Sequence, residues 1–331
     1  MKHKIESIVV MRVMAMLMII VYHSFCFYTH EWSMGGIYVP IWDKVASFFD
    51  AVDLPMFIFI SGYLFGYLFI NKGKYRDRRS FILSKAKRLI VPYIFWGLFL
   101  IFFMPELHKW RSLLTGISHL WFLLVLFEIF ILVIPVVSWL CEKATTRLFF
   151  LFLLCLYLLF IVFHRYSSHH AFLAFHTTMY YLPTFIIGIA CARYKISQKL
   201  SIVWSVTLIV VFFLILFYYI FITGKLQYVQ NYLLLQLIGT GFVISLFCIL
   251  NNIRFQRGLY NSFLHLDRLS MGIYIFNQIS INAFLLINGI VPFLNDNYCE
   301  GPIIICSVGF LVPLLLSYLF NKTKYLKWTI G

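Results

Sequence analysis

Long runs of apolar residues alternate with short polar segments along the whole chain. Ten of these runs are long enough to cross a hydrocarbon core of about 30 Å as helices. Their approximate limits are 7–27, 48–70, 88–104, 119–140, 147–163, 178–192, 202–222, 231–250, 269–289 and 302–320. The polar segments between them are too short to fold independently. The pattern therefore predicts an all-α, polytopic membrane helix bundle of about ten transmembrane helices, in which residues 1–331 form a single domain.

The composition agrees with a chain whose main solvent is lipid. Apolar residues make up 62% of it and charged residues only 12%, whereas a soluble domain has about 25% charged residues. A soluble fold could not cover so much apolar surface with so few charges. An ordinary cytosolic enzyme, a disordered chain and a coiled coil are all excluded.

The distribution of the basic residues explains the formal net charge of +15. If the ten runs are spans, 21 of the 27 Lys and Arg residues fall on one side of the membrane, eight of them between Lys72 and Arg88. By the positive-inside rule this side is the cytoplasm, and both termini lie there. The excess of positive charge is therefore a topology signal, and no nucleic-acid partner is expected.

Ionisable residues inside a span are costly and are candidates for function. The first predicted helix holds two of them, Arg12 and His23. Their separation of eleven residues brings both side chains to one face, about 16 Å apart along the axis. We expect this face to line a polar cavity inside the bundle. The alternative is that Arg12 extends to the cytoplasmic headgroups while His23 bonds a neighbouring helix.

A basic segment precedes the third predicted helix. Lys85 and Arg88 are three residues apart at its start, so they share a helix face and could bind the phosphates of a cytosolic cofactor. Spacing alone favours the simpler explanation, in which these cations only anchor the helix at the cytoplasmic surface.

Several segments in order resemble the acyltransferase family 3 membrane proteins, which acylate surface glycans. The resemblance covers nearly the whole length. The matching segments are Arg12 and His23 with ten residues between them, Pro55–Tyr63, Lys85 and Arg88 before Pro92, His119–Phe122, Leu182–Gly188 and Ser270–Tyr274. Two positions differ from the family pattern: Lys85 stands where arginine is usual, and Asn277 stands where many relatives have histidine.

The resemblance implies an acyltransferase, most simply an O-acetyltransferase of a bacterial inner or plasma membrane. The donor would be a cytosolic acyl-CoA, usually acetyl-CoA, whose charged end lies near Arg12, Lys85 and Arg88. The acceptor would be a hydroxyl of a surface or exported polysaccharide or of its lipid-linked precursor. His23 would act either as a general base, which needs fewer steps, or as a transient acyl carrier.

Other residues near the outer surface are further candidates. Asp53, in the second predicted helix, could orient His23 or bind the acceptor hydroxyl, although an acid at the interface is also inexpensive. His119 and Trp121 could contact the acceptor sugar, and Trp121 also fits the aromatic belt of a membrane protein.

Two further expectations concern metals and an alternative function. The histidines between 164 and 176 have no carboxylate or thiol beside them, so we expect no metal site. A transporter of a glycan or lipid-linked intermediate would also place charges inside spans. Transporters often show inverted repeats, and this sequence has no such self-similarity.

Overall fold

The chain is helical throughout the part that the computed structural model describes, which comprises residues 2–29, 34–105, 107–166, 173–223 and 229–331. Strands are absent from these residues. The helices group into two compact units. The first contains Met1–Phe57 and Ser197–Lys324, and the second contains Ile58–Ile196 and Tyr325–Gly331.

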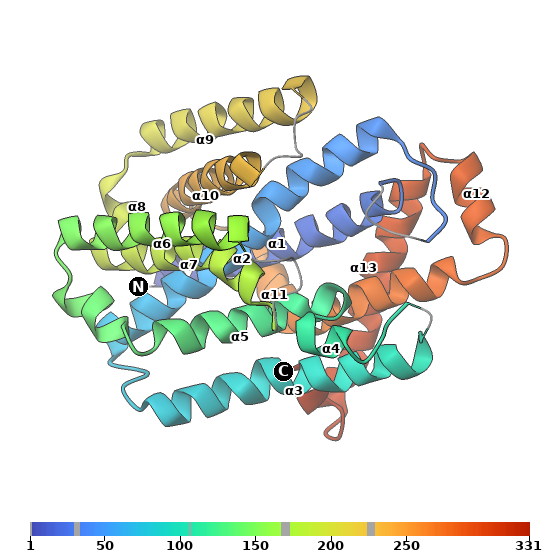
Figure 1. Ribbon diagram of the computed structural model, residues 1–331, viewed down its shortest axis with the longest axis horizontal. Coiled ribbons are helices and arrows are strands. Elements are labelled where there is room, and N and C mark those ends of the chain that lie inside the picture. Colours follow the sequence, from blue (N-terminus) through green and yellow to red (C-terminus); the bar gives the residue numbers. More distant parts are fainter. Residues whose placement is uncertain (1, 30–33, 106, 167–172, 224–228) are drawn as a thin grey trace. The chain divides into compact units, whose positions relative to one another are not determined.

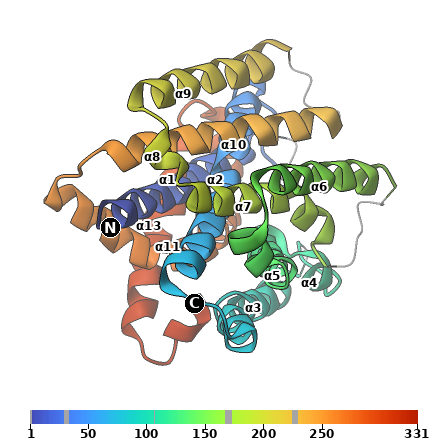
Figure 2. The ribbon, with the colours of Figure 1, turned by 90° about the vertical axis from the view of Figure 1, so that its left-hand side faces the viewer.

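The first unit is built from helices at both ends of the chain. They are α1 (Lys2–Cys26), the first part of α2 (Pro40–Lys72), α9 (Ile202–Phe217), η3 (Tyr218–Thr223), α10 (Val229–Asn252), α11 (Arg257–Leu285), α12 (Ile290–Asp296) and α13 (Gly301–Lys322). α11 packs against both α1 and α13, and α9 lies beside α10 (Figures 1 and 2). N- and C-terminal segments of the sequence thus share one helical core.

The second unit holds the middle of the chain and its last seven residues. Its elements are the second part of α2, α3 (Arg78–Phe103), α4 (Ser112–Thr115), η1 (Ser118–Leu120), α5 (Trp121–Val133), η2 (Trp139–Lys143), α6 (Thr146–Tyr166), α7 (Phe175–Tyr194) and η4 (Lys327–Ile330). A short helix, α8 (Ile196–Lys199), follows α7. α5 packs against α3 and α7, and η4 packs against α3.

Each of the ten predicted apolar stretches overlaps at least one helix, but not all of these helices have the length and apolarity of a span. Seven helices in the described residues meet both conditions, and α11 with α12 forms an eighth candidate bent by 93°. The stretches 147–163 and 178–192 correspond to α6 and α7, which are not among them. α11 also begins at Arg257, twelve residues before the apolar stretch predicted at 269–289.

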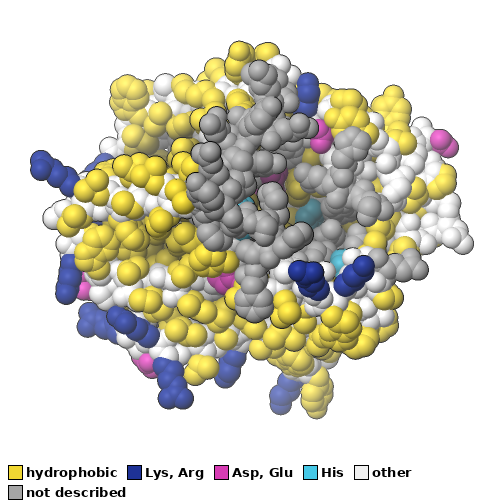
Figure 3. Space-filling model, in the orientation of Figure 1, with side chains coloured by type: hydrophobic (Ala, Val, Ile, Leu, Met, Phe, Trp, Pro, Cys, Tyr) yellow, Lys and Arg dark blue, Asp and Glu magenta, His cyan; other side chains and the backbone are white. Residues whose placement is uncertain are grey.

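Apolar side chains cover the outer face of α6. Phe150, Leu151, Leu154 and Leu158 are each more than half exposed, and hydrophobic side chains dominate this region of the surface (Figure 3). Water would penalise such a face, whereas lipid solvates it without cost. The exposed side of α6 therefore has the chemistry of a lipid-facing helix.

Close helix contact in the second unit depends on two glycines, one on α2 and one on α7. A Cβ atom at Gly188 would overlap the Phe59 carbonyl oxygen, and one at Gly62 would overlap the Phe185 carbonyl oxygen. These atoms belong to the backbone and cannot rotate away. Small residues at such crossings are typical of membrane helices, because only they let two backbones approach so closely. Two of the segments that resemble the family, Pro55–Tyr63 and Leu182–Gly188, meet here.

The loop after α1 is fixed by a buried tyrosine. The Tyr28 hydroxyl donates a hydrogen bond of 3.0 Å to the Leu294 carbonyl on α12. Burial, with Cys299 and Glu300 nearby, raises the pKa of Tyr28 to about 12. Phe27 and Tyr28 also pack against Ile281 and Leu285 in an apolar cluster at the end of α11. The hydroxyl therefore stays protonated and holds the start of the loop against α12.

Candidate functional site

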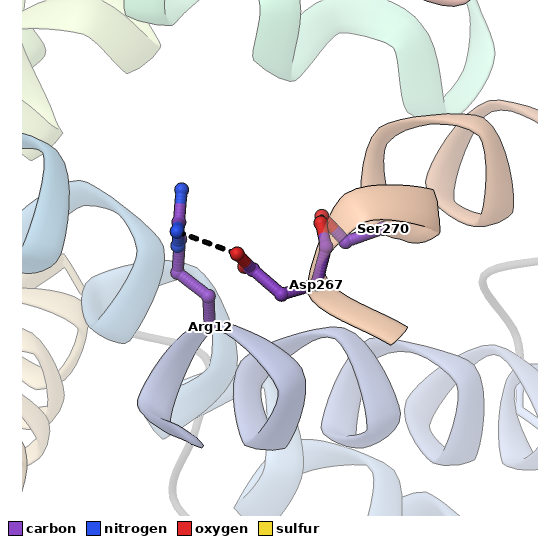
Figure 4. A network of polar contacts seen from close by, with 3 residues as sticks. All are labelled: Arg12, Asp267 and Ser270. Carbon is purple, nitrogen blue, oxygen red and sulfur yellow. Dashed lines mark hydrogen bonds and ion pairs between the residues drawn. The ribbon is translucent and has the colours of Figure 1, made fainter. Parts of the chain in front are cut away.

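Arg12 and His23, on one face of α1, each bond a polar side chain of α11. The Arg12 guanidinium donates to the Asp267 carboxylate at 2.7 Å, as Figure 4 shows, and the Ser270 hydroxyl donates to the Asp267 carbonyl oxygen at 2.8 Å. His23 Nδ1 bonds Asn277 Oδ1. The polar face of α1 therefore packs against another helix, and neither side chain has to be solvated by lipid.

The two contacts show that α1 and α11 run in the same direction. Arg12 and His23 are eleven residues apart on α1, and their partners Asp267 and Asn277 are ten residues apart on α11. At 1.5 Å per residue these separations are about 16 Å and 15 Å. Two parallel helices with matched polar positions are thus joined at both ends of a common seam.

The middle of this seam is apolar, in contrast to the cavity that the sequence predicts. Met16 and Ile20 of α1 pack with Leu269 and Ile273 of α11 between the two polar contacts. The helical period fixes which residues of α1 share a face, but it does not fix what lies opposite them. The polar groups are therefore at the two ends of the seam, and a continuous polar passage does not follow this face.

His23 is held at the end of a buried chain of hydrogen bonds. Its residue surface is 8% exposed and that of Asn277 is 0%. Asn277 Nδ2 donates to the Gly309 carbonyl oxygen of α13 at 2.7 Å. A Cβ atom at Gly309 would lie 2.9 Å from Asn277 Nδ2 and 2.9 Å from the Ile281 Cδ1 atom. Glycine at 309 therefore leaves the space in which the Asn277 amide lies.

Asp53 is a buried acid in the same unit. It is 1% exposed, and its Oδ1 accepts from the Leu54 backbone amide. Oδ2 is buried and has no hydrogen-bond partner in the described part of the chain. The carboxyl lies close enough to Tyr274, one turn before Asn277, to interact with its hydroxyl electrostatically. His23 is thus bonded to Asn277 rather than to Asp53.

Of the three cations predicted for cofactor binding, Arg12 bonds Asp267, and Lys85 and Arg88 lie in different surroundings. The Lys85 ammonium lies 4.2 Å from the centre of the Phe130 ring of α5, a cation–π contact. Arg88 is exposed and lines a pocket of about 630 Å³. The other lining residues are Asp77, Arg79, Ser80, Leu83, Ser84, Lys87, Trp328 and Gly331. The pocket therefore has three cations, none of which is Lys85.

The last residues of the chain form one wall of this pocket. The Trp96 indole donates to the Thr329 carbonyl oxygen at 2.8 Å, and the Trp328 ring meets Phe95 edge to face at 5.3 Å. Thr329 and Ile330 are buried against α3, while Trp328 is 53% exposed. The terminal segment is thus anchored so that an indole face stands beside the three cations.

The predicted acceptor residues lie where η1 meets α5. His119 is 5% exposed, and the Ser118 hydroxyl is 3.4 Å from His119 Nδ1. The Trp121 ring stacks on Tyr181 of α7 with 6.2 Å between the ring centres. Both side chains therefore have contacts within the second unit, and their role toward an acceptor stays a prediction.

Glu128 is a second buried acid. It lies on α5 and caps the N-terminus of α7. The Thr178 hydroxyl donates to Oε2 at 2.6 Å, and the Ala174 amide donates to Oε1 at 3.3 Å. Because helix N-termini attract negative charge, this arrangement ties α5 to α7. It gives a structural role to an acid for which the sequence suggests no partner.

The described residues contain no group of three or more His, Cys, Asp or Glu side chains that could hold a metal ion. Of the histidines between 164 and 176, His169 and His170 lie outside the residues that the structure describes.

One comparison with known proteins is informative. A family model described as an acyltransferase domain, acyltransferase 3, matches residues 5–322. The chain belongs to the acyltransferase 3 family. This confirms the resemblance inferred from the ordered segments, and with the apolar helices it makes the chain a multi-pass membrane protein of an acyltransferase family. Comparison with curated proteins and with solved structures finds no match.

Arg12 and His23 belong to a segment that resembles the family, but the matching segments do not identify their partners, Asp267 and Asn277. Asp267 is one of only twelve acidic residues in the chain. An acid beside a span can form an ion pair with Arg12. That rarity is a usable signal. Asn277 is marked in the sequence only by its departure from the family pattern, and this does not identify His23 as its partner, because an amide in an apolar helix can bond to many groups.

Proposed function

We propose that the chain transfers an acyl group, most simply acetyl, from coenzyme A to a hydroxyl of a surface or exported polysaccharide or of its lipid-linked precursor. Family membership supports acyl transfer. His23 supports a proton-transfer role, because a neutral imidazole can accept a proton at one ring nitrogen. The membrane would be the inner or plasma membrane of a bacterium, crossed by about ten helices with both termini in the cytoplasm.

The parallel course of α1 and α11 supports this topology. Helices that cross a membrane in the same direction are separated by an odd number of intervening spans. The ten-span assignment places seven spans between the first and the ninth, which correspond to α1 and α11. The bases between Lys72 and Arg88 would then lie on the cytoplasmic side, where the acyl donor is available.

The pocket on α3 supports a nucleotide-bearing donor. Arg79, Lys87 and Arg88 are suited to phosphate groups, and the half-exposed Trp328 ring is suited to stacking on a nucleobase. The nucleotide end of coenzyme A carries both features. The volume of about 630 Å³ lies within the range that small-molecule sites occupy. We assign this end of the donor to the pocket.

The reaction needs one proton acceptor and one leaving group. His23 takes the proton of the acceptor hydroxyl while that oxygen attacks the thioester carbonyl, and the carbon–sulfur bond then breaks. The proton passes to the departing thiolate, which leaves as coenzyme A. Asp53, whose buried Oδ2 has no hydrogen-bond partner in the described part of the chain, is our candidate for binding a hydroxyl of the acceptor. His119 and Trp121 remain candidates for contact with the sugar.

Two measurements on one variant test the proposal. Radiolabelled acetyl-CoA is supplied to membranes that contain the chain or its His23→Ala variant, and label in the glycan is measured together with glycan mass. We expect the mass of one acetyl group per modified sugar with the native chain and none with the variant. Coenzyme A should still raise the melting temperature of both proteins. Normal transfer by His23→Ala, or no effect of coenzyme A on either protein, would refute the proposal.

A further inference from the structure

The hydrogen bond between His23 and Asn277 constrains where the imidazole carries its hydrogen. A neutral imidazole has one N–H donor and one acceptor nitrogen, and either nitrogen can take either role. His23 Nδ1 faces Asn277 Oδ1. An amide oxygen can only accept, so this contact requires hydrogen on Nδ1, provided that the amide is oriented with its oxygen toward the ring.

The Gly309 carbonyl fixes that orientation. The other end of the Asn277 amide lies 2.7 Å from the Gly309 oxygen. A carbonyl oxygen cannot donate, so the group facing it must be the NH₂. The reversed amide would place two oxygens against each other at one end and lose the bond there. The backbone of α13 therefore determines which end of Asn277 meets His23.

We propose that Asn277 is a positioning residue that holds His23 in the tautomer with hydrogen on Nδ1, so that Nε2 is the basic nitrogen in acyl transfer. This inference rests on the proposed function and adds to it the identity of the reacting atom. Nε2 takes the hydroxyl proton and later gives it to the thiolate sulfur. Nδ1–H bonds Asn277 Oδ1 before, during and after this transfer, so the amide need not rearrange.

The packing around the amide supports a role in orientation. Asn277 is fully buried, and Gly309 leaves just enough space for its amide. A buried asparagine can satisfy its amide group by bonding to the backbone of its own helix. The amide of Asn277 is instead oriented by the Gly309 carbonyl of another helix. α13 thus fixes the orientation of the amide, and His23 of α1 bonds to the oxygen that this orientation presents. An uncharged amide also orients the ring without placing a second charge beside it.

Substitutions at position 277 separate orientation from packing. Asn277→Leu keeps the approximate shape and removes the acceptor, and Asn277→Asp keeps an acceptor oxygen. We expect Asn277→Leu to lower kcat about 100-fold with little change in KM, because a general base contributes at least this factor. Asn277→Asp should retain kcat within about tenfold of the native chain, since Nδ1–H still has an acceptor.

Asn282→Leu is the matched control. Asn282 is a buried asparagine on the same helix, and in the described part of the chain its side chain is not bonded to His23. Its substitution should change kcat less than twofold. Equal losses for Asn277→Leu and Asn282→Leu, or equal losses for Asn277→Leu and Asn277→Asp, would overturn the inference.

Nitrogen-15 NMR of the native protein provides a test that does not depend on a variant at position 277. With imidazole-labelled histidine, the His23 signals are assigned by their absence from His23→Ala. We expect the signal of a nitrogen bearing hydrogen at Nδ1 and of a bare nitrogen at Nε2. The opposite pattern overturns the inference. It leaves the proposed function intact if His23→Ala lacks transfer, whereas active His23→Ala refutes the function itself.

Discussion

Asp267 of α11 accepts a 2.7 Å hydrogen bond from the Arg12 guanidinium of α1. The Arg12 side chain is 30% exposed and that of Asp267 is 9% exposed, so the pair lies at the margin of the core. Its contribution should therefore exceed that of a surface ion pair and stay below that of a fully buried one.

Breaking this pair should weaken the packing of α1 on α11. We expect Asp267→Asn to lower the free energy of unfolding by about 1–2 kcal/mol, because the bond is charge-assisted but partly solvated. The exchanged pair, Arg12→Asp with Asp267→Arg, should recover part of the loss. Thermal unfolding in detergent measures both. Arg268→Gln, at an exposed neighbour, is the control, and an equal effect there would show that the pair contributes nothing.

Donor affinity should depend on the pocket that α3 and η4 form. We expect Arg88→Gln and Trp328→Ala each to weaken binding of coenzyme A about tenfold, through a lost charge-assisted bond and a lost stacking surface. Competition with radiolabelled coenzyme A measures the affinity. Higher salt should weaken binding to the native chain, as for any phosphate held by cations.

Three variants outside the pocket serve as controls for donor affinity. Lys74 is exposed and Tyr325 is 82% exposed, and neither lines the pocket, so Lys74→Gln and Tyr325→Ala should bind as the native chain does. Lys85→Gln should weaken binding less than Arg88→Gln, because its ammonium lies over Phe130. A larger effect of Lys85→Gln would move the phosphate site away from this pocket.

Asp53 should affect the acceptor rather than the donor. If its buried oxygen binds an acceptor hydroxyl, Asp53→Asn should raise the KM for the acceptor about tenfold and leave the affinity for coenzyme A unchanged. A fall in kcat at constant KM would instead indicate that Asp53 acts through His23. Steady-state kinetics with varied acceptor distinguish the two results, with Asp50→Asn, at an exposed position, as the control.

Gly188 should not tolerate even one added carbon. Alanine there would overlap backbone atoms of Phe59 and Tyr63 on α2, and overpacking against atoms that cannot move costs about 3 kcal/mol or more. We expect Gly188→Ala to yield little folded protein in size-exclusion chromatography. Gly258→Ala, where a Cβ meets no atom within 4 Å, should leave the yield unchanged or improve it, and equal losses at both positions would argue against the crossing.

The helical architecture follows from the hydrophobic pattern because membrane spans need long apolar runs and satisfied backbone groups. The pattern places a helix at each of the ten stretches. It misses the start of α11 at Arg257, because this end of the helix is polar in sequence. Phe263 and Leu266 nevertheless pack, partly buried, against the apolar cluster that α1 and α11 form. The pattern also does not predict the 93° bend between α11 and α12.

The candidate site is less accessible to prediction from sequence. The helical period puts Arg12 and His23 on one face, and the structure agrees. The period does not predict that α11 lies opposite this face or that apolar side chains pack between the two polar contacts. It also does not predict that Asn277 bonds the imidazole of His23. Similarly, Lys85 and Arg88 are three residues apart, yet packing against Phe130 draws Lys85 away. Contacts between distant segments decide these outcomes, and spacing carries no information about them.

The apolar packing in the middle of the α1–α11 seam also bears on the proton gradient across the membrane. Met16, Ile20, Leu269 and Ile273 offer no site at which a proton could pause between His23 and Asp267. On the proposed mechanism, hydrogen ions that the imidazole releases during turnover meet an apolar layer along this seam. Under that mechanism, protons are exchanged within a membrane span without draining the electrochemical gradient through the contact of these two helices.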